Sequence, residues 1–183
     1  MKKNILIISG IFMLFVFCSC ATAPKVKERT DPDTAFVYGS LDLSGLYTRL
    51  MWVTVEQYEP PTEKPYIKTF TKEKVFYIQN LKKGSYSISS VGDTESDIHN
   101  IASDFGSFEI EKPKLLYFGS YKIIRYKSGR KEVVNDYSTT EADVIKGILV
   151  NTDKGTYWHG ELIKRLEKLK DIESRKAKIP RAE

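Results

Sequence analysis

Short runs of apolar and β-branched residues, separated by turn-forming residues, fill the chain from residue 35 to residue 137. Runs of this kind, bounded by Gly, Pro, Asn, Asp and Ser, are typical of strands that turn back on one another. The pattern therefore predicts a mainly β domain, an antiparallel sandwich or barrel. The expected strands cover residues 35–43, 46–58, 66–70, 74–79, 85–91, 104–111, 114–126 and 131–135.

Proline and glycine mark the breaks between these strands. Pro60 and Pro61 end the second run, because proline has no N–H to donate to a neighbouring strand. Gly119 lies inside the long run 114–126, where a glycine indicates a bulge or a bend. A turn at residues 128–129 is expected to let residues 131–135 pair back as a hairpin.

The hydrophobic period changes after residue 137, which predicts one or two C-terminal helices. Ser138 and Glu141 have the spacing of a capping box, so we expect a short helix from there to about Leu149. A second helix is predicted by apolar residues that share one helical face, with charged residues on the other. That face comprises Trp158, Leu162, Ile163, Leu166 and Leu169.

Charged residues of the second helix also form a predicted pair. Glu161 and Arg165 are four positions apart, a spacing that favours an ion pair along a helix. The basic residues from Lys164 to Arg181 could contact anionic headgroups, but acids lie between them. We therefore expect this face to be solvated, and residues after about Ser174 to fray.

The N-terminus has the layout of a secretory signal peptide. Lys2 and Lys3 precede an apolar run from residue 5 to residue 17. Residues 17–20 read Phe-Cys-Ser-Cys and resemble the lipobox of bacterial lipoproteins. The resemblance implies cleavage after residue 19 and attachment of lipid, including palmitate, to Cys20. The alternatives are an uncleaved membrane helix and ordinary secretion. The lipoprotein and the membrane helix both place the remainder of the chain outside the cytoplasm.

These boundaries define the expected organisation of the chain. Residues 1–19 form the signal peptide, and residues 20–34 a lipidated terminus with a flexible tether, because that segment is polar and proline-containing. Residues 35–137 form the β domain and residues 138–183 the helical segment. The expected location is the cell membrane or the outer membrane, facing the periplasm or the cell surface.

Composition limits the functional classes. Both cysteines lie at or before Cys20, so the β domain has no thiol for a disulfide and must depend on core burial. Loss of Lys2 and Lys3 lowers the net charge from +5 to +3, with both signs mixed along the chain. A nucleic-acid-binding protein usually has a clustered basic face. We therefore do not expect nucleic acid as a partner. The expected partner is the membrane, through the lipid on Cys20.

Two segments carry a family resemblance. Residues 76–88 (FYIQNLKKGSYSI) resemble a pattern of carboxypeptidase-regulatory-like and transthyretin-like β-sandwiches. In that pattern Phe76 and Ile78 share one strand face and Tyr86 and Ile88 share another. Residues 108–119 (FEIEKPKLLYFG) are similar to a hairpin found in bacterial lipoproteins with such sandwiches. The resemblance implies an Ig-like or transthyretin-like antiparallel β-sandwich, membrane anchoring and a binding role, with no catalytic residue.

Polar candidates for chemistry are few. The acidic segment 93–100 could bind Ca²⁺, but Ile98 replaces the glycine that an EF-hand loop requires, and a solvated loop is the simpler interpretation. His99 and His159 are the only histidines, and no G-x-S-x-G motif accompanies them. Trp52 and Trp158 could line a ligand surface, but aromatic residues at such positions more often belong to the core.

The sequence therefore predicts a non-enzymatic, membrane-anchored lipoprotein of the cell envelope with a structural or binding role. No cofactor, metal or catalytic residue is expected, and an envelope protein is a possible partner through the C-terminal helix. Two alternatives stay open. One is a surface-exposed lipoprotein that binds a host or carbohydrate ligand, and the other is an envelope hydrolase.

Overall fold

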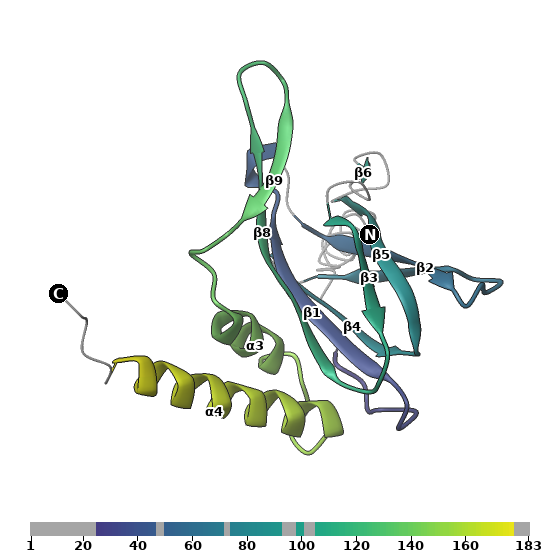
Figure 1. The fold of residues 1–183 in the computed structure, drawn as a ribbon, viewed down its shortest axis with the longest axis vertical. Coiled ribbons are helices and arrows are strands. Elements are labelled where there is room, and N and C mark those ends of the chain that lie inside the picture. The colour runs from purple at the N-terminus through teal and green to yellow at the C-terminus, as the bar shows by residue number, and fades with distance from the viewer. Residues whose placement is uncertain (1–24, 47–49, 72–73, 93–97, 101–104, 178–183) are drawn as a thin grey trace, which may run out of the picture.

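A computed structural model describes residues 25–46, 50–71, 74–92, 98–100 and 105–177 (Figure 1). The proposed signal segment, Cys20 and residues 93–97 of the acidic segment lie outside the described residues.

In the described part of the chain nine strands form two sheets; eight of them correspond to predicted runs, and the short β6 lies in a segment that was expected to be a loop. The first sheet has the order β4-β1-β8-β9, with bounds Val75–Leu81, Ala35–Asp42, Leu115–Arg125 and Lys131–Asn135. The second has the order β3-β2-β5-β6, with β7 also paired to β5. Its bounds are Tyr66–Phe70, Trp52–Glu59, Gly84–Gly92, Ile98–Asn100 and Ser107–Ile110.

Three helical elements complete the described fold. A short 3-10 helix, η2 (Ser44–Leu46), lies between β1 and β2. Two α-helices follow the strands, α3 (Glu141–Leu149) and α4 (Tyr157–Ala177). The mainly β character and the C-terminal helices are therefore confirmed. Helix α4 continues past Ser174, where fraying was expected.

The main core lies between the two sheets, in a sandwich-like arrangement. Phe76 and Ile78 of β4 are both buried in this core, and so are Tyr86 and Ile88 of β5. Leu81, at the end of β4, is buried in the same cluster. The predicted sharing of strand faces in residues 76–88 is therefore confirmed.

A second core lies between the first sheet and the two helices. Figure 1 shows α3 and α4 together on the side of β1 and β8 that faces away from the second sheet. Phe36 and Tyr38 point to this side, where they pack with Trp158. Strand β1 is therefore buried on both faces, because sheet packs on one side of it and helix on the other.

One pairing differs from the antiparallel expectation. Strands β1 and β8 are parallel, with Phe36 opposite Leu115 and Asp42 opposite Lys122, whereas the other strand pairs are antiparallel. Parallel strands are characteristically buried on both faces. The long apolar composition of β1 satisfies this requirement, but its pattern does not identify which distant strand lies beside it.

The two motifs that carry the family resemblance both connect the sheets. Residues 76–88 contain β4 of the first sheet and β5 of the second. Residues 108–119 were expected to form a hairpin, which is wrong: β7 pairs with β5, whereas β8 pairs with β1 and β9. The residue Pro113 has no N–H to donate to a neighbouring strand, and it lies in the exposed connection between the sheets.

Residues 25–34, expected to belong to a flexible tether, instead pack on the domain. Val26 is buried and forms a parallel bridge with Thr152. The guanidinium of Arg29 lies 4.4 Å from the ring centroid of Tyr157, and the carboxylate of Glu28 accepts a hydrogen bond from the Tyr157 backbone N–H. One buried apolar side chain and several polar contacts, among them the ion pair of Lys25 with Asp153, hold this polar segment against the α3–α4 connection, the start of α4 and the end of β4.

The start of α3 also differs from expectation. Its N-cap is Thr140, whose hydroxyl accepts a hydrogen bond from the Asp143 N–H at 3.2 Å, and the Asp143 side chain completes the capping box. The predicted box of Ser138 and Glu141 is wrong. The hydroxyl of Ser138 instead donates to Asp136, which lies before the helix.

Candidate functional site

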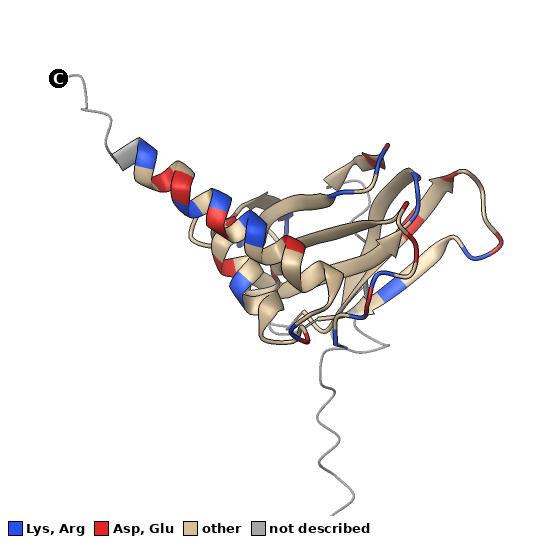
Figure 2. Ribbon diagram, turned by 90° about the horizontal axis from the view of Figure 1, so that it is seen from below, with Lys and Arg blue, Asp and Glu red and all other residues tan. Residues whose placement is uncertain are grey.

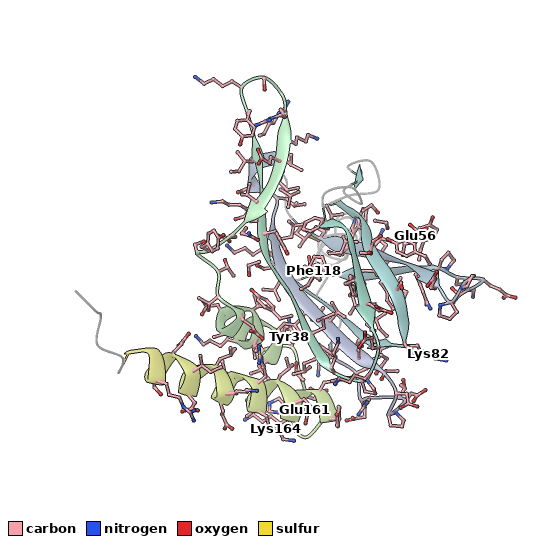
Figure 3. The ribbon with its side chains drawn as sticks, viewed as in Figure 1. Tyr38, Glu56, Lys82, Phe118, Glu161 and Lys164 are labelled. Atoms are coloured by element: carbon pink, nitrogen blue, oxygen red, sulfur yellow. The ribbon has the colours of Figure 1, made fainter. Side chains whose placement is uncertain are left out.

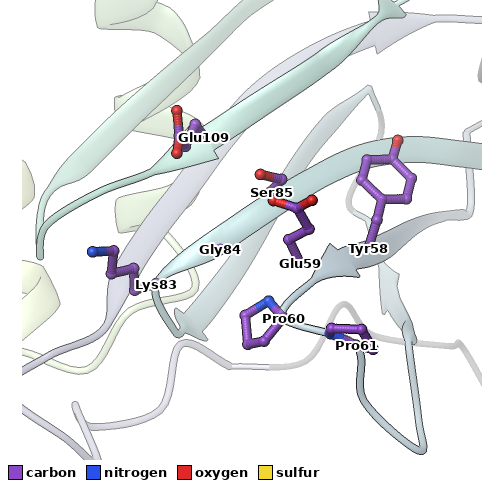
Figure 4. A pocket seen from close by; sticks show the side chains of 8 residues that line it. All are labelled: Tyr58, Glu59, Pro60, Pro61, Lys83, Gly84, Ser85 and Glu109. Atoms are coloured by element: carbon purple, nitrogen blue, oxygen red, sulfur yellow. The ribbon is translucent and has the colours of Figure 1, made fainter.

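A hollow of about 690 Å³ opens where β2 ends and β5 begins (Figure 4). It lies beside the connection that follows β2 and beside the edge strand β7. The residues that line it are Tyr58, Glu59, Pro60, Pro61, Lys83, Gly84, Ser85 and Glu109.

Local backbone contacts build the wall of the hollow. Gly84 allows β5 to approach the end of β2, because a Cβ atom at this position would lie 2.2 Å from the carbonyl oxygen of Glu59. The side-chain amide of Gln57 donates to the carbonyl oxygen of Pro60 at 3.3 Å. A glycine and an amide therefore hold the proline-containing turn beside β5.

The lining combines apolar surface with hydrogen-bonding groups. The ring of Tyr58 is 41% exposed and lies near the two exposed prolines. In Figure 4 the side chains of Tyr58, Glu59, Ser85 and Glu109 rise from the same side of the strands. Two carboxylates, a serine hydroxyl and a phenol hydroxyl thus face the open space. The ammonium of Lys83 lines the hollow as well, so charges of both signs are present. This arrangement suits a polar ligand that also has an apolar face.

A polar cluster beneath the helices has a structural role. The hydroxyl of Tyr38 donates to Glu141 at 2.6 Å, and Arg165 donates to both oxygens of the same carboxylate at 2.8 and 2.9 Å. Burial, followed by the hydrogen bond to Glu141, raises the pKa of Tyr38 above its usual range. The cluster joins β1, α3 and α4 and therefore fixes the helices to the sheet.

This cluster changes the ion pairs expected along α4. Glu161 was expected to pair with Arg165, but it pairs with Lys164 at 2.8 Å. Figure 3 shows Glu161 and Lys164 together on α4, with Tyr38 between this helix and the sheet. Arg165 turns to Glu141 because that carboxylate is less exposed and already accepts a hydrogen bond from Tyr38.

A buried carboxylate, that of Asp136, stabilises the turn between β9 and α3. Asp136 accepts hydrogen bonds from the hydroxyls of Ser138 and Thr139 at 2.5 and 2.8 Å, and Lys74 lies 3.9 Å away. Burial opposes ionisation of this carboxyl, but the hydrogen bonds and Lys74 together hold its pKa below the usual value. Its contacts indicate a turn-forming role.

The aromatic and histidine candidates do not form a site. Trp52 and Trp158 are buried, as expected of core residues. His99 lies on β6 of the second sheet, whereas His159 lies on α4, which covers the first sheet. The backbone N–H of His159 donates to the hydroxyl of Thr156, one turn earlier. The fold therefore does not bring the two histidines to a shared position.

Metal-ligating side chains do not gather within the described ranges, where no group of three His, Cys, Asp or Glu could hold an ion. Residues 93–97 of the candidate Ca²⁺ segment are outside those ranges.

The charged face of α4 carries acidic residues between the basic ones, as expected, and Arg175 pairs with Asp171 at 2.7 Å. Both signs alternate along this helix in Figure 2.

Sequence reasoning missed the hollow. Pro60 and Pro61 were interpreted only as a strand break, and Tyr58 only as part of a strand. The available signal was an aromatic residue next to two prolines, together with Gly84. That signal does not show that Glu109, from a later strand, completes the wall.

No helix in the described part of the chain is both long and apolar enough to span a membrane. No model of a known protein family matches the chain, and no curated protein or solved structure matches it either.

Proposed function

We propose that this chain is a lipid-anchored protein of the bacterial cell envelope that acts by binding a ligand. In this proposal it is exported, cut before Cys20 and held in the cell membrane or the outer membrane by acyl chains on that cysteine. Several acyl chains anchor a protein far more firmly than one chain does. The support for the anchor is the signal-like segment and the lipobox-like residues 17–20.

The docked segment 25–34 bears on how the domain would sit. Cys20 and Lys25 are five residues apart, a stretch of at most about 18 Å when fully extended. Because Val26 is buried in the domain, an anchor at Cys20 would keep that end of the domain close to the membrane surface.

The finer fold proposal is an Ig-like or transthyretin-like β-sandwich followed by two helices. Beyond the two packed sheets, one hydrogen bond supports it. The hydroxyl of Tyr86 donates to the carbonyl oxygen of Lys82 at 2.8 Å. In Ig-like sandwiches a tyrosine near the start of a strand similarly bonds to backbone a few residues upstream.

The hollow between Tyr58 and Glu109 carries the binding part of the proposal. A saccharide fits its chemistry, since one sugar face is apolar and can lie on the Tyr58 ring. The sugar hydroxyls can donate to the carboxylates of Glu59 and Glu109 and can exchange hydrogen bonds with Ser85. The open and shallow form of the site suits recognition of part of a longer chain.

The binding experiment uses the purified full chain on an array of saccharides. We expect Tyr58→Ala and Glu109→Gln to weaken retention of the bound sugars about tenfold, because each removes one contact of a shallow site. Tyr137→Ala is the matched control, since Tyr137 is 89% exposed and does not line the hollow. Equal retention by all three variants would refute a ligand site here, and hydrolysis of a retained sugar would support the hydrolase alternative instead.

The anchor has its own test. Intact-mass analysis of the membrane-extracted protein should give a chain that begins at residue 20 and carries lipid, and Cys20→Ser should move the protein out of the membrane fraction. An unmodified Met1 start would exclude the lipoprotein assignment and would favour an uncleaved membrane helix.

The far part of α4 is a second proposed surface, for an envelope protein partner. Figure 1 shows this helix extending beyond α3. Ile172 is 37% exposed there, next to the pair formed by Asp171 and Arg175. Cross-linking from Lys168, which is exposed one turn earlier on α4, tests this surface in intact envelopes, and a pattern unchanged by Ile172→Asp would exclude it.

A further inference from the structure

The tip of the hairpin formed by β8 and β9 projects beyond the other strands of both sheets (Figure 1). Strand β8 continues for three residues past its last pairing with β1, which joins Asp42 and Lys122. Within the described residues β9 pairs with β8 alone. In the outer part of this hairpin, residues 122–132, the side chain of Ile123 is buried, but residues 125–132 are all exposed.

The hairpin is one of two segments with a high net positive charge; the other is the C-terminal segment 164–181, which has eight basic and three acidic side chains. Residues 122–132 contain five basic side chains and one acidic side chain, a net charge of +4. Without this segment and without Lys2 and Lys3, the remaining chain has a net charge of −1. The five basic side chains are all exposed: Lys122, Arg125, Lys127, Arg130 and Lys131.

Two of these cations face each other without a compensating acid. Arg125 and Lys131 are directly opposite in the antiparallel ladder, where like charges are unfavourable. Neither has an acidic partner among the described residues. The one acid of the hairpin, Glu132, is engaged by Arg130 at 3.3 Å and by the Tyr126 hydroxyl at 2.8 Å. An incoming anion would relieve the repulsion between Arg125 and Lys131.

We propose that the β8–β9 hairpin binds an anionic polysaccharide through Arg125, Lys131 and their basic neighbours. A protein partner would need an apolar centre to its interface. The one large apolar side chain exposed on the hairpin is Tyr126, whose ring is covered by Arg130 at 4.6 Å. Carboxylates or sulfates repeated along a flexible glycan need only the charges that the hairpin presents.

The position of the hairpin favours a glycan over the anchoring membrane. Strands β1 and β8 are parallel and start at the same end of the sheet, where Lys27 N–H donates to the Gln79 side chain. The 11 residues of β8 then span roughly 33 Å toward the hairpin tip. The tip is thus at the end opposite Val26. Presentation away from the membrane rests on the proposed anchor, but glycan binding does not.

The test measures retention of the purified full chain on heparin and on polygalacturonate, with a polyglutamate column and anionic phospholipid vesicles in parallel. We expect the double variant R125Q/K131Q to bind the two glycans about tenfold more weakly at low salt, because two exposed charge contacts are lost. The matched control K168Q/K170Q removes the same charge from exposed positions of α4 and should change retention little. Circular dichroism confirms that both variants are folded.

Three other outcomes would overturn the glycan assignment. Equal losses in both double variants would show a general charge effect without a site. Tighter binding to vesicles or polyglutamate than to the glycans would assign the hairpin to a membrane or a protein. Aggregation of R125Q/K131Q with unchanged glycan retention would show that the two cations protect an edge strand. Normal glycan retention by a chain found to lack lipid at Cys20 would remove the anchor and leave the glycan site.

Discussion

The two sheets differ in how many of their faces are buried. The first sheet packs against the second on one face and against α3 and α4 on the other, so seven of the eight residues of β1 are buried. The second sheet leaves more of its other face exposed. In β2, residues 58 and 59 are exposed, and Thr54 and Glu56 are half-buried. The covered sheet stabilises the fold, whereas the open sheet leaves side chains accessible.

The composition of the open face fits this difference. Ser85 and Ser87 of β5 alternate with the inward Tyr86, and Ser107 and Glu109 lie beside them on β7. Small and polar side chains keep such a face soluble without apolar patches. The candidate hollow lies at one end of this face. We therefore expect substitutions on the covered sheet to change stability and those on the open face to change binding.

The largest expected effect is at the centre of the covered face. Phe36 is fully buried, with its ring centroid 5.7 Å from that of Tyr77 and 5.2 Å from that of Trp158. Phe36→Ala should lower the free energy of unfolding in urea by about 3–5 kcal/mol, because it leaves a cavity. Ser85→Ala on the open face should change it by less than about 0.5 kcal/mol. Similar losses for both variants would invalidate the comparison.

A smaller, pH-dependent effect is expected at Asp136, where the covered sheet meets α3. Because hydrogen bonds and Lys74 lower its pKa in the folded state, the ionised carboxylate stabilises the fold above the unfolded value of 3.8. This contribution is lost as the pH falls through the lower pKa of the folded state. Asp136→Asn should cost about 1–3 kcal/mol at neutral pH. In urea melts at a series of pH values, the two proteins should converge well below pH 3.8; a constant difference would exclude this linkage.

Two neighbouring cations on α4 allow a half-buried ion pair to be compared with an exposed one. Arg165→Ala should cost about 1–2 kcal/mol, because Glu141 loses a bidentate partner in a half-buried position. Lys164→Ala removes an exposed pair with Glu161 and should cost no more than about 0.5 kcal/mol. The measurement is again urea unfolding, and a double-mutant cycle of Arg165→Ala with Tyr38→Phe should show coupling. Independent effects would mean that the three side chains do not act together.

The smallest expected effect is that of replacing a serine by alanine on each sheet, on the face that points away from the other sheet. Ser40 of β1 and Ser87 of β5 have buried hydroxyls with no hydrogen-bond partner among the described residues. Removing an unpaired hydroxyl should be neutral or stabilising by up to about 1 kcal/mol. We expect gains of similar size from the two variants, because both hydroxyls are buried. Thermal unfolding that shows a loss for Ser40→Ala would indicate a hydrogen bond at that hydroxyl.

Much of the fold could be predicted because local patterns report burial. The strands at residues 66–70 and 131–135 have the bounds that were expected, and both C-terminal helices are present. The wrong predictions concern polar side chains that have more than one possible hydrogen-bonding partner. Ser138 bonds to Asp136 in preference to capping α3, and Arg165 bonds to Glu141 in preference to Glu161. Spacing alone cannot rank such partners, because their burial depends on the assembled fold.

The amino-acid sequence by itself determined most of the segments that form strands or helices, since a two-residue or a 3.6-residue period indicates which side chains avoid water. It missed the short strand β6, in a segment that was expected to be a loop. It also determined that the β domain relies on core burial without disulfides, because no cysteine follows Cys20. Only the tertiary structure decided that residue 36 lies beside residue 115 in a parallel pair, and that β7 and β8 belong to different sheets. The hollow likewise exists only in the fold, where residues 58–61, 83–85 and 109 meet. The reason is physical: a hydrophobic pattern specifies that a face is buried, but many partners could bury it, and packing of the whole chain selects one.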